Sequence, residues 1–362
     1  MRRFILFIGI CCLIGGCTMD VSKESNETDN KNVAFMNKWL RNDNGLLATY
    51  IQHSDVKDED LVAGRESLSE TLGLWMIYAL EKGDCELFAE SYKQLNTFFL
   101  ENDGFVHWKL TEDGISEVST NAFIDDIRIS SALLDAYELW GEEAYVDTAN
   151  TMNAYVSANN VNIGIFTDFY DREEGYASSN ITLSYIDIQA MNKMAEQGSL
   201  NRQVVENTTS VLTEAPLHNG FYPKSYNVEN ETYAYDSDIN MVDQVITAYH
   251  DAQVGNSSEE LLSFIQAEMS ENGIVYGMYD LETKEPVVDY ESPAIYGFLV
   301  LYLLEVDEVQ TANDVFDRMK AFQVTNANSE YEGGYSITDG DTHIFDNIVP
   351  FIAEQFMQHH KQ

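Results

Sequence analysis

Apolar residues recur with the period of an amphipathic helix in about twelve stretches of the chain, and polar residues fill the positions between them. Several stretches open with a helix-capping sequence, such as Ser257-Ser258-Glu259-Glu260 or Ser292-Pro293. The pattern predicts an all-α protein. The predicted helices span residues 31–42, 66–82, 84–100, 121–140, 142–158, 183–197, 200–213, 238–254, 257–271, 293–305, 307–322 and 344–360.

A short phrase that joins glycine to aromatic residues recurs between pairs of these helices, roughly every 53 to 60 residues. Each phrase is typical of a turn into a short strand or hairpin. Two helices per repeat and about six repeats predict one (α/α)6 toroid over residues 33–362, in which an inner ring of helices lines a central cleft. An α-solenoid is the alternative, but its repeats are usually shorter, about 34 to 47 residues. The phrases contain Gly104, Gly164, Gly220, Gly273 and Gly333.

The N-terminus has the layout of a secretory signal, in which two arginines, an apolar run and two glycines precede Cys17. The apolar run, from Phe4 to Ile14, is too short to cross a bilayer as a helix. A cysteine in this position is typical of a bacterial lipobox. We therefore predict a signal peptide over residues 1–16, a lipid on Cys17 and attachment to the extracellular face of the membrane. The alternative is a plain signal peptide with an incidental cysteine.

The segment after the lipobox, residues 17–32, is polar and has little to bury, which predicts a disordered tether. Beyond the signal and the lipidated cysteine, only Cys85 remains, so an internal disulfide is impossible. The formal net charge of −41 repels nucleic acid and disfavours polyanionic substrates. We expect a monomer with no nucleic-acid partner, whose ligand is a neutral or cationic sugar.

Acids and aromatic residues gather where the predicted inner helices begin. Any one acid at such a position can be explained as a helix cap. Their recurrence at one end of a ring favours an active cleft, which needs carboxyl groups of different strengths facing each other. The set comprises Glu70, Asp125, Asp126, Tyr185, Asp187, Asp236, Asp238, Tyr290, Glu291, His343 and Asp346.

Glu70 stands out because the helix that carries it is otherwise largely apolar. Burial raises the pKa of a carboxyl group, which suits a general acid. Gly73 lies one turn away on the same face. A glycine inside a helix costs about 1 kcal/mol relative to alanine, and room for a sugar ring beside Glu70 is an explanation.

The sequence around Glu70 resembles the signature of glycoside hydrolase family 8, whose members carry Ser-Glu-Gly-x-Gly-Tyr-Gly-Met followed by an alanine. In that family the glutamate donates a proton to the glycosidic oxygen, so the resemblance implies that role for Glu70. The matching residues are Ser69, Glu70, Gly73, Met76 and Ala79, and the departures are Thr71, Leu74 and Trp75.

Two further segments resemble the same family. The run from Asp126 to Leu134 is similar to Asp-Leu-Asp-Ile-Ala-Tyr-Ala-Leu-Leu, which implies that Asp126, next to Asp125, holds the sugar at the cleavage point. Arg128 replaces the second aspartate of that motif.

The third segment, Tyr235-Asp236-Ser237-Asp238, is similar to the family's Tyr-Asp-Ala, whose aspartate activates water. The resemblance implies Asp236 as the general base, with Asp238 as a substitute. The arginines that follow in the family are absent here.

The resemblance implies an inverting glycoside hydrolase that cleaves a β-linked bacterial exopolysaccharide, similar to lipoprotein members of the family that accompany an exopolysaccharide synthesis complex. The alternative is a non-catalytic lipoprotein on the same toroid that binds and guides polysaccharide. A polysaccharide lyase is less compatible with the negative charge. The sequence has no phosphate loop and no convincing zinc spacing, so we expect no metal and no cofactor. Possible stacking platforms for sugar rings are Trp108, Tyr185, Tyr235 and Tyr290.

Overall fold

The computed structural model describes residues 27–56, 58 and 61–360, so the predicted signal peptide and Cys17 lie outside the described residues. The described chain is built from helices joined by short hairpins. The helices are α1 (Glu27–Trp39), α2 (Ser69–Lys82), α3 (Cys85–Gln94), α4 (Phe123–Trp140), α5 (Glu143–Asn159), α6 (Ile188–Glu196), α7 (Arg202–Thr213), α8 (Met241–Ala252), α9 (Glu259–Glu271), α10 (Pro293–Glu305), α11 (Val309–Lys320) and α12 (Phe345–His360).

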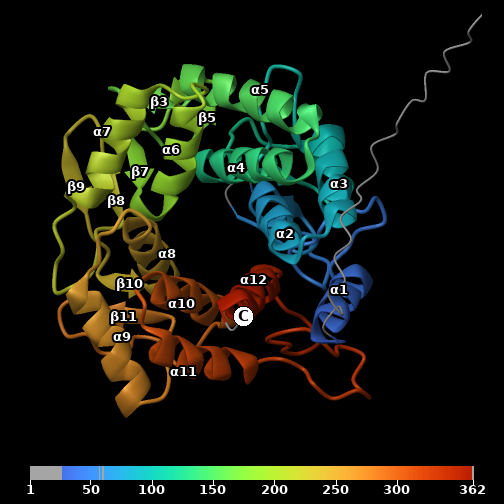
Figure 1. Ribbon diagram of the computed structural model, residues 1–362, viewed down its shortest axis with the longest axis vertical. Helices are drawn as coiled ribbons and strands as arrows, with labels where there is room; N and C mark the ends of the chain where they lie inside the picture. Colours follow the sequence, from blue (N-terminus) through green and yellow to red (C-terminus); the bar gives the residue numbers. More distant parts are fainter. Residues whose placement is uncertain (1–26, 57, 59–60, 361–362) are drawn as a thin grey trace, which may run out of the picture.

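Six of these helices form a closed inner ring. In the order α2, α4, α6, α8, α10 and α12, each packs against the next, and α12 packs back against α2 (Figure 1). The other six lie outside them, and one continuous apolar core joins the two layers. This arrangement is the (α/α)6 toroid predicted from the sequence.

The composition of the helices explains which of them are inside. α10 has the sequence PAIYGFLVLYLLE, and its residues from Pro293 to Leu303 are all buried, as expected for a helix that is apolar all round. α11 buries only one stripe, formed by Ala312, Val315 and Met319, and exposes its charged face.

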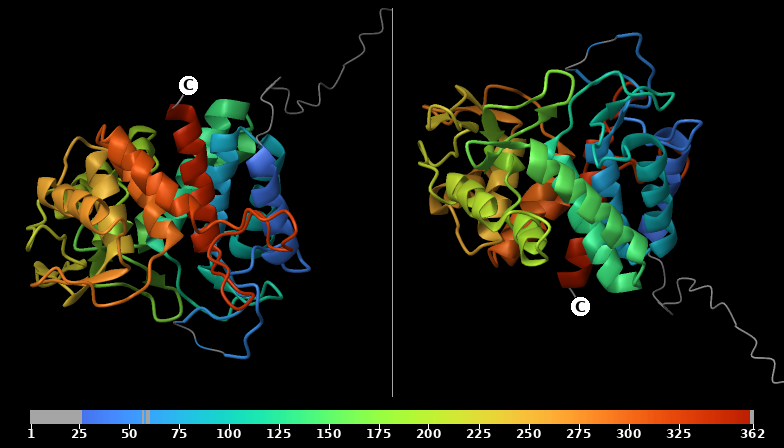
Figure 2. Two further views of the ribbon diagram at one scale, coloured as in Figure 1. Left: turned by 90° about the horizontal axis from the view of Figure 1, so that it is seen from below. Right: turned by 90° about the horizontal axis from the view of Figure 1, so that it is seen from above.

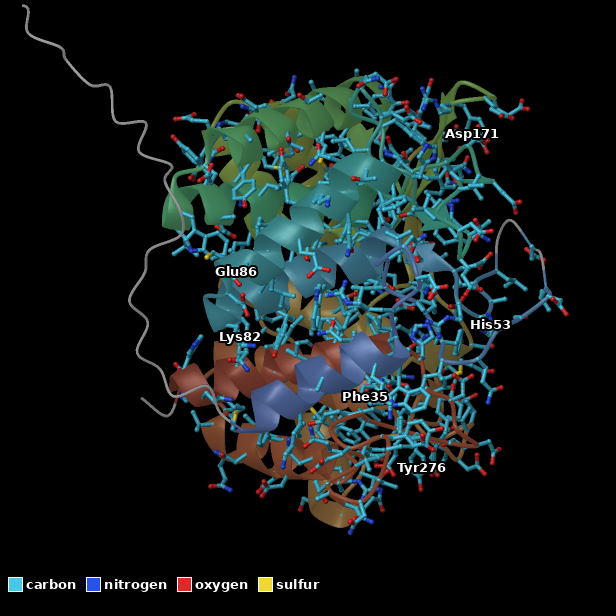
Figure 3. All side chains as sticks on the ribbon, turned by 90° about the vertical axis from the view of Figure 1, so that its right-hand side faces the viewer. Phe35, His53, Lys82, Glu86, Asp171 and Tyr276 are labelled. Carbon is cyan, nitrogen blue, oxygen red and sulfur yellow. The ribbon has the colours of Figure 1, made fainter. Side chains whose placement is uncertain are left out.

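Short strands precede the inner helices at one end of the ring, which we call the mouth; the opposite end is the back face. Figure 2 shows the loops and hairpins gathered at the mouth. In Figure 3, His53, Asp171 and Tyr276 lie at the mouth, and Lys82 and Glu86 lie at the back face. The strands are β1 (Ser67–Leu68), β2 (Lys109–Leu110), β3 (Val161–Asn162), β4 (Ile165–Phe166), β5 (Tyr170–Asp171), β6 (Tyr176–Ala177), β7 (Asn180–Thr182), β8 (Ser225–Asn227), β9 (Thr232–Ala234), β10 (Asp238–Asn240) and β11 (Met278–Asp280).

The predicted tether reaches too far into the chain, because α1 already begins at Glu27. Asn32, at the end of the predicted tether, is fully buried, and its Nδ2 donates to Oε2 of Glu354 on α12 at 2.9 Å. Residues 27–32 therefore belong to the folded domain. None of the helices in the described part of the chain is long and apolar enough to cross a membrane.

Candidate active site

Glu70 lies in the first turn of α2, at the mouth. The antiparallel pairing of β1 with β2 fixes this position, since Ser67 is the partner of Leu110. The amide of Ser69 donates to the carbonyl oxygen of Trp108 at 3.0 Å, and Ser69 Oγ donates to Oδ2 of Asp125 at 2.7 Å. The hairpin, the start of α2 and the start of α4 are thereby tied together around Glu70.

The charges next to Glu70 come from α4. Arg128 Nη1 donates to Oδ1 of Asp125 at 2.8 Å, and Asp125 also accepts the backbone amide of Glu70. Burial raises the pKa of Glu70 to about 7; the charge of Asp125 raises it further and that of Arg128 lowers it. The carboxyl group of Glu70 has no hydrogen-bond partner among the described residues, and the residue is partly buried.

The space beside Gly73 is filled by the side chain of Arg128. A Cβ atom at position 73 would lie 3.2 Å from Arg128 Cδ and 3.2 Å from Ile129 Cγ1. Gly73 therefore allows α2 and α4 to approach closely, and the predicted space for a sugar ring at this glycine is wrong.

A cleft of about 430 Å³ opens beside the start of α2 and α4. Its lining includes the aromatic residues Trp108, Phe169, Tyr176 and Tyr185, together with Asp168 and Asp171. Aromatic rings beside carboxylates are the combination that binds pyranose rings, whose CH faces stack and whose hydroxyls donate hydrogen bonds. Trp108 and Tyr185, two of the predicted platforms, are both part of this lining.

Asp168 is a partly buried acid of the cleft. Its two oxygens accept hydrogen bonds from the amide of Thr182 at 2.7 Å and from Thr182 Oγ1 at 2.9 Å. Burial raises the pKa of Asp168 to about 6, and the hydrogen bonds from Thr182 limit the increase.

The hydroxyl group of Tyr185, in the lining of the cleft, lies within reach of the charges of four acids. Burial is the main cause of its raised pKa, and the negative charges of Asp125, Asp168, Glu70 and Asp243 add to it. We call these four acids the carboxylate cluster. Asp243 comes from the first turn of α8.

Two side chains hold Asp243 in place. Ser184 Oγ donates to its Oδ1 at 3.1 Å, and Lys224 Nζ pairs with its Oδ2. The cluster thus joins α2, α4, α8 and the segment between β4 and β5.

Comparison with known proteins identifies the family of this chain. Residues 50–253 match the family described as glycosyl hydrolases family 8. This chain belongs to glycosyl hydrolase family 8. It is 35% identical over 368 residues to the putative lipoprotein YdaJ of Bacillus subtilis (strain 168), and the alignment covers 98% of both chains.

Solved structures of the same shape include a novel alpha-amylase from Clostridium perfringens, with a TM-score of 0.81 and 22% identity over 92% of this chain and 99% of that one. PssZ from Listeria monocytogenes has a TM-score of 0.75 and 25% identity over 94% of this chain and 99% of that one. The chain therefore has the glycoside hydrolase fold of family 8 over almost its whole length.

The two adjacent aspartates that resemble the sugar-holding motif of family 8 have different surroundings. Asp125 is bound to Ser69 and Arg128 beside Glu70. Asp126 is 1% exposed, its Oδ2 accepts from Asn121 Nδ2 at 2.6 Å, and its Oδ1 has no partner among the described residues. Burial raises the pKa of Asp126 well above its usual range. Of the pair, Asp125 is the one joined to Glu70.

The residues that resemble the family 8 base segment lie on the exposed hairpin before α8. Asp236 and Asp238 are exposed, and neither carboxylate has a hydrogen bond or ion pair with a described residue. Tyr235 Oη donates to the carbonyl oxygen of Pro216. Tyr290 is 53% exposed and packs over Gly277. No described contact joins these four residues to the carboxylate cluster.

Three other acids of the predicted set make contacts that stabilise the fold. Asp187 caps α6 by accepting from the amide of Ala190 at 2.9 Å. Glu291 pairs with Arg318, and Asp346 Oδ1 accepts from Ser292 Oγ at 2.5 Å. For these acids the capping or structural explanation applies.

Asp168 and Asp243 were not among the residues predicted from the sequence. Asp243 is the third residue of α8, just as Asp125 is the third residue of α4, so equal distance from the helix start was an available signal. Asp168 stands within the phrase that begins at Gly164. Among the described residues, no group of three or more His, Cys, Asp or Glu side chains is arranged to hold a metal ion.

Proposed function

We propose that this protein is an inverting glycosidase that hydrolyses a β-linked, neutral or amino-sugar exopolysaccharide. The observation that carries the proposal is the carboxyl group of Glu70. Its pKa of about 7 keeps a proton available near neutral pH, and it has no hydrogen-bond partner among the described residues. It stands next to a cleft lined by aromatic rings, where a glycosidic oxygen can reach it.

For the general base, the contacts favour Asp243. It shares the carboxylate cluster with Glu70, and the ion pair with Lys224 and the hydrogen bond from Ser184 hold its carboxylate in one place. Inversion needs the acid and the base about 6.5–9.5 Å apart, with a water between the base and the sugar. Asp236, with Asp238 as its substitute, remains the alternative that the family resemblance implies.

The reaction is balanced by two proton transfers. Glu70 gives its proton to the glycosidic oxygen as the C–O bond breaks, and the leaving sugar departs as an alcohol. Asp243 takes a proton from the attacking water as the new C–O bond forms on the opposite face. Solvent then returns Glu70 to its protonated state and Asp243 to its ionised state.

For the location, we propose a lipid anchor on Cys17 at the outer face of the membrane, close to the machinery that makes the polysaccharide. The lipobox pattern and the description of the relative YdaJ as a putative lipoprotein support this location.

A panel of purified polysaccharides tests the hydrolase. The full-length protein in detergent should release reducing ends from a neutral or amino-sugar β-linked polymer, and proton NMR should show the inverted anomer first. Because the Clostridium structure is described as an alpha-amylase, starch belongs in the panel as the α-linked control. Hydrolysis of starch alone would contradict the β-linkage. Binding without any hydrolysis would favour the non-catalytic guide protein.

Three asparagine variants identify the base. Asp243→Asn should lower the rate by about 10²–10⁴-fold, as is usual for loss of a positioned acid or base. Asp236→Asn and Asp238→Asn should retain most of the activity and serve as matched controls. The reverse pattern would assign the base to the exposed hairpin.

A further inference from the structure

A second cavity lies on the axis of the ring, and Arg128 is part of its wall. It measures about 190 Å³, and all six inner helices contribute to its wall. It shares no lining residue with the cleft at the mouth. Its lining includes Glu81, Asp135 and Lys193, from the C-terminal halves of three inner helices, and Gln253 at the C-terminal end of α8, so this part of the wall lies toward the back face.

Several hydrogen-bonding groups in this wall have no protein partner. A guanidinium has five N–H donors, and that of Arg128 uses only Nη1, toward Asp125, among the described residues. His250 is 7% exposed; its Nδ1 lies 3.3 Å from Gln253 Oε1, and its Nε2 has no partner in the described chain. Buried polar groups of this kind normally have a partner, which points to a ligand or to ordered water.

The charges around the cavity are largely compensated within the protein. Lys193 Nζ lies 2.5 Å from Asp135 Oδ1, and His359 Nδ1 lies 3.4 Å from Glu81 Oε2. Asp187 also lines the cavity; its Oδ1 accepts from the amide of Ala190 and lies 3.9 Å from His250 Nδ1, so this carboxylate can accept a hydrogen bond from a hydroxyl group. The chemistry favours a neutral ligand that both donates and accepts hydrogen bonds.

Apolar and aromatic side chains make up a large part of the wall, with Tyr249, Phe298 and Phe356 beside Ile77 and Ile352. A cavity of about 150 Å³ is known to hold benzene, so this one has room for a single six-membered ring. A pyranose combines an apolar CH face with hydroxyls that donate and accept. We propose that the axial cavity is a second sugar site, sized for one neutral monosaccharide and connected to Glu70 through Arg128.

The connection follows from the position of Arg128. Arg128 is part of the wall of the axial cavity, and its guanidinium holds Asp125 next to Glu70. A sugar hydroxyl that accepts a hydrogen bond from the guanidinium of Arg128 changes the environment of its positive charge. Because this charge lowers the pKa of Glu70, binding in the cavity alters how readily Glu70 holds its proton. Binding in the cavity and binding in the cleft are then coupled, and the coupling is reciprocal. The sugar site itself does not depend on the proposed hydrolase function; only the coupling rests on it.

Binding is tested on the full-length Glu70→Gln protein in detergent, which removes hydrolysis from the experiment. Glucose, galactose and N-acetylglucosamine are the probes, measured by saturation-transfer NMR and calorimetry. At least one should bind in the millimolar range. No binding of any of the three would overturn the proposal.

Three substitutions locate the bound sugar. Ala132→Phe fills the cavity and should abolish monosaccharide binding. His250→Phe keeps the ring shape but removes a hydrogen bond, and it should weaken binding about tenfold even if the first variant fails to fold. Trp108→Ala, in the mouth cleft, should leave in place the part of monosaccharide binding that the two cavity variants remove.

Binding that survives both cavity variants, or that Trp108→Ala abolishes, would place the sugar in the mouth cleft and overturn the proposal. Monosaccharide binding in the cavity of a protein that hydrolyses no polymer would leave this site standing while the hydrolase proposal fails.

Discussion

Gly73 on α2 lies directly against the aliphatic stem of Arg128 on α4. A Cβ atom at position 73 would be 3.2 Å from Arg128 Cδ, closer than most side-chain contacts. The glycine therefore sets where the guanidinium lies, and the guanidinium in turn holds Asp125 beside Glu70. The absence of a side chain at position 73 therefore contributes to the geometry of the candidate site.

Gly73→Ala should separate stability from activity. Alanine gains about 1 kcal/mol of helix propensity over glycine, and the close contact with Arg128 and Ile129 offsets this gain. The free energy of unfolding should change by less than about 1 kcal/mol. Hydrolysis should fall because Arg128 must move. Urea denaturation and a reducing-sugar assay measure the two effects, and full activity in the alanine variant would show that the placement of Arg128 is unimportant.

Arg128→Gln should move the alkaline limb of the pH–activity profile upward. The positive charge of Arg128 lowers the pKa of Glu70, so its removal lets the carboxyl group stay protonated to higher pH. The wild type should lose kcat/KM as the pH rises through about 7, where Glu70 loses its proton. The limb of the variant should lie at higher pH. An unchanged or lower limb would mean that another group donates the proton.

Glu70→Gln should lower the rate of hydrolysis by about 10²–10⁴-fold, because the amide has no proton to transfer to the leaving oxygen. Binding of the polymer should persist, since the amide keeps the shape of the side chain. Full activity in this variant would assign the proton donor to another acid.

The same variant should be more stable than the wild type, in a pH-dependent way. The folded-state pKa of Glu70, about 7, is above its usual 4.5, so the folded wild type loses stability as the pH rises between these values. Glutamine does not titrate. Its advantage should be absent at pH 4 and reach on the order of 2 kcal/mol at pH 8, less than the full shift because the side chain is partly exposed. Thermal denaturation across this range measures it, and an advantage that shrinks with rising pH would contradict the assignment.

Cys17→Ala should release the protein from the membrane fraction or stall its processing. The thiol of Cys17 is the only group at the predicted cleavage site that can carry the lipid. Cell fractionation and the mobility of the mature chain on gels measure the effect. Cys85→Ala, inside the folded domain, is the control and should fractionate like the wild type.

The helices could be predicted from the sequence because their signals are local. Each of the twelve predicted segments overlaps one of the helices of the structure, and α10 has the predicted bounds, Pro293–Glu305. The differences lie at helix boundaries: α1 ends at Trp39 and α3 at Gln94, earlier than predicted, and several predicted helix starts are not α-helical. Residues 238–240 form β10, because they pair with β11 across a hairpin, and Leu183–Tyr185 forms a separate short turn before α6.

The site was only partly predictable because its contacts join distant parts of the chain. Glu70 was recognised from its apolar helix and from a local motif. Asp243 is placed by Ser184, 59 positions away, and by Lys224, 19 positions away, and no local pattern records such pairings. The need for a glycine at position 73 likewise comes from a different helix, because the side chain of Arg128 packs against it.

The direction of α1 determines how the protein stands relative to a membrane. The chain enters α1 at the back face, and the helix runs toward the mouth, where Trp39 Nε1 donates to the carbonyl oxygen of Glu330 (Figure 3). Nine residues lie between Cys17 and Glu27, and a chain of that length spans at most about 35 Å from one to the other. If Cys17 carries the proposed lipid, this length keeps the back face toward the bilayer and the cleft opens away from it, so that a polymer outside the membrane can reach Glu70.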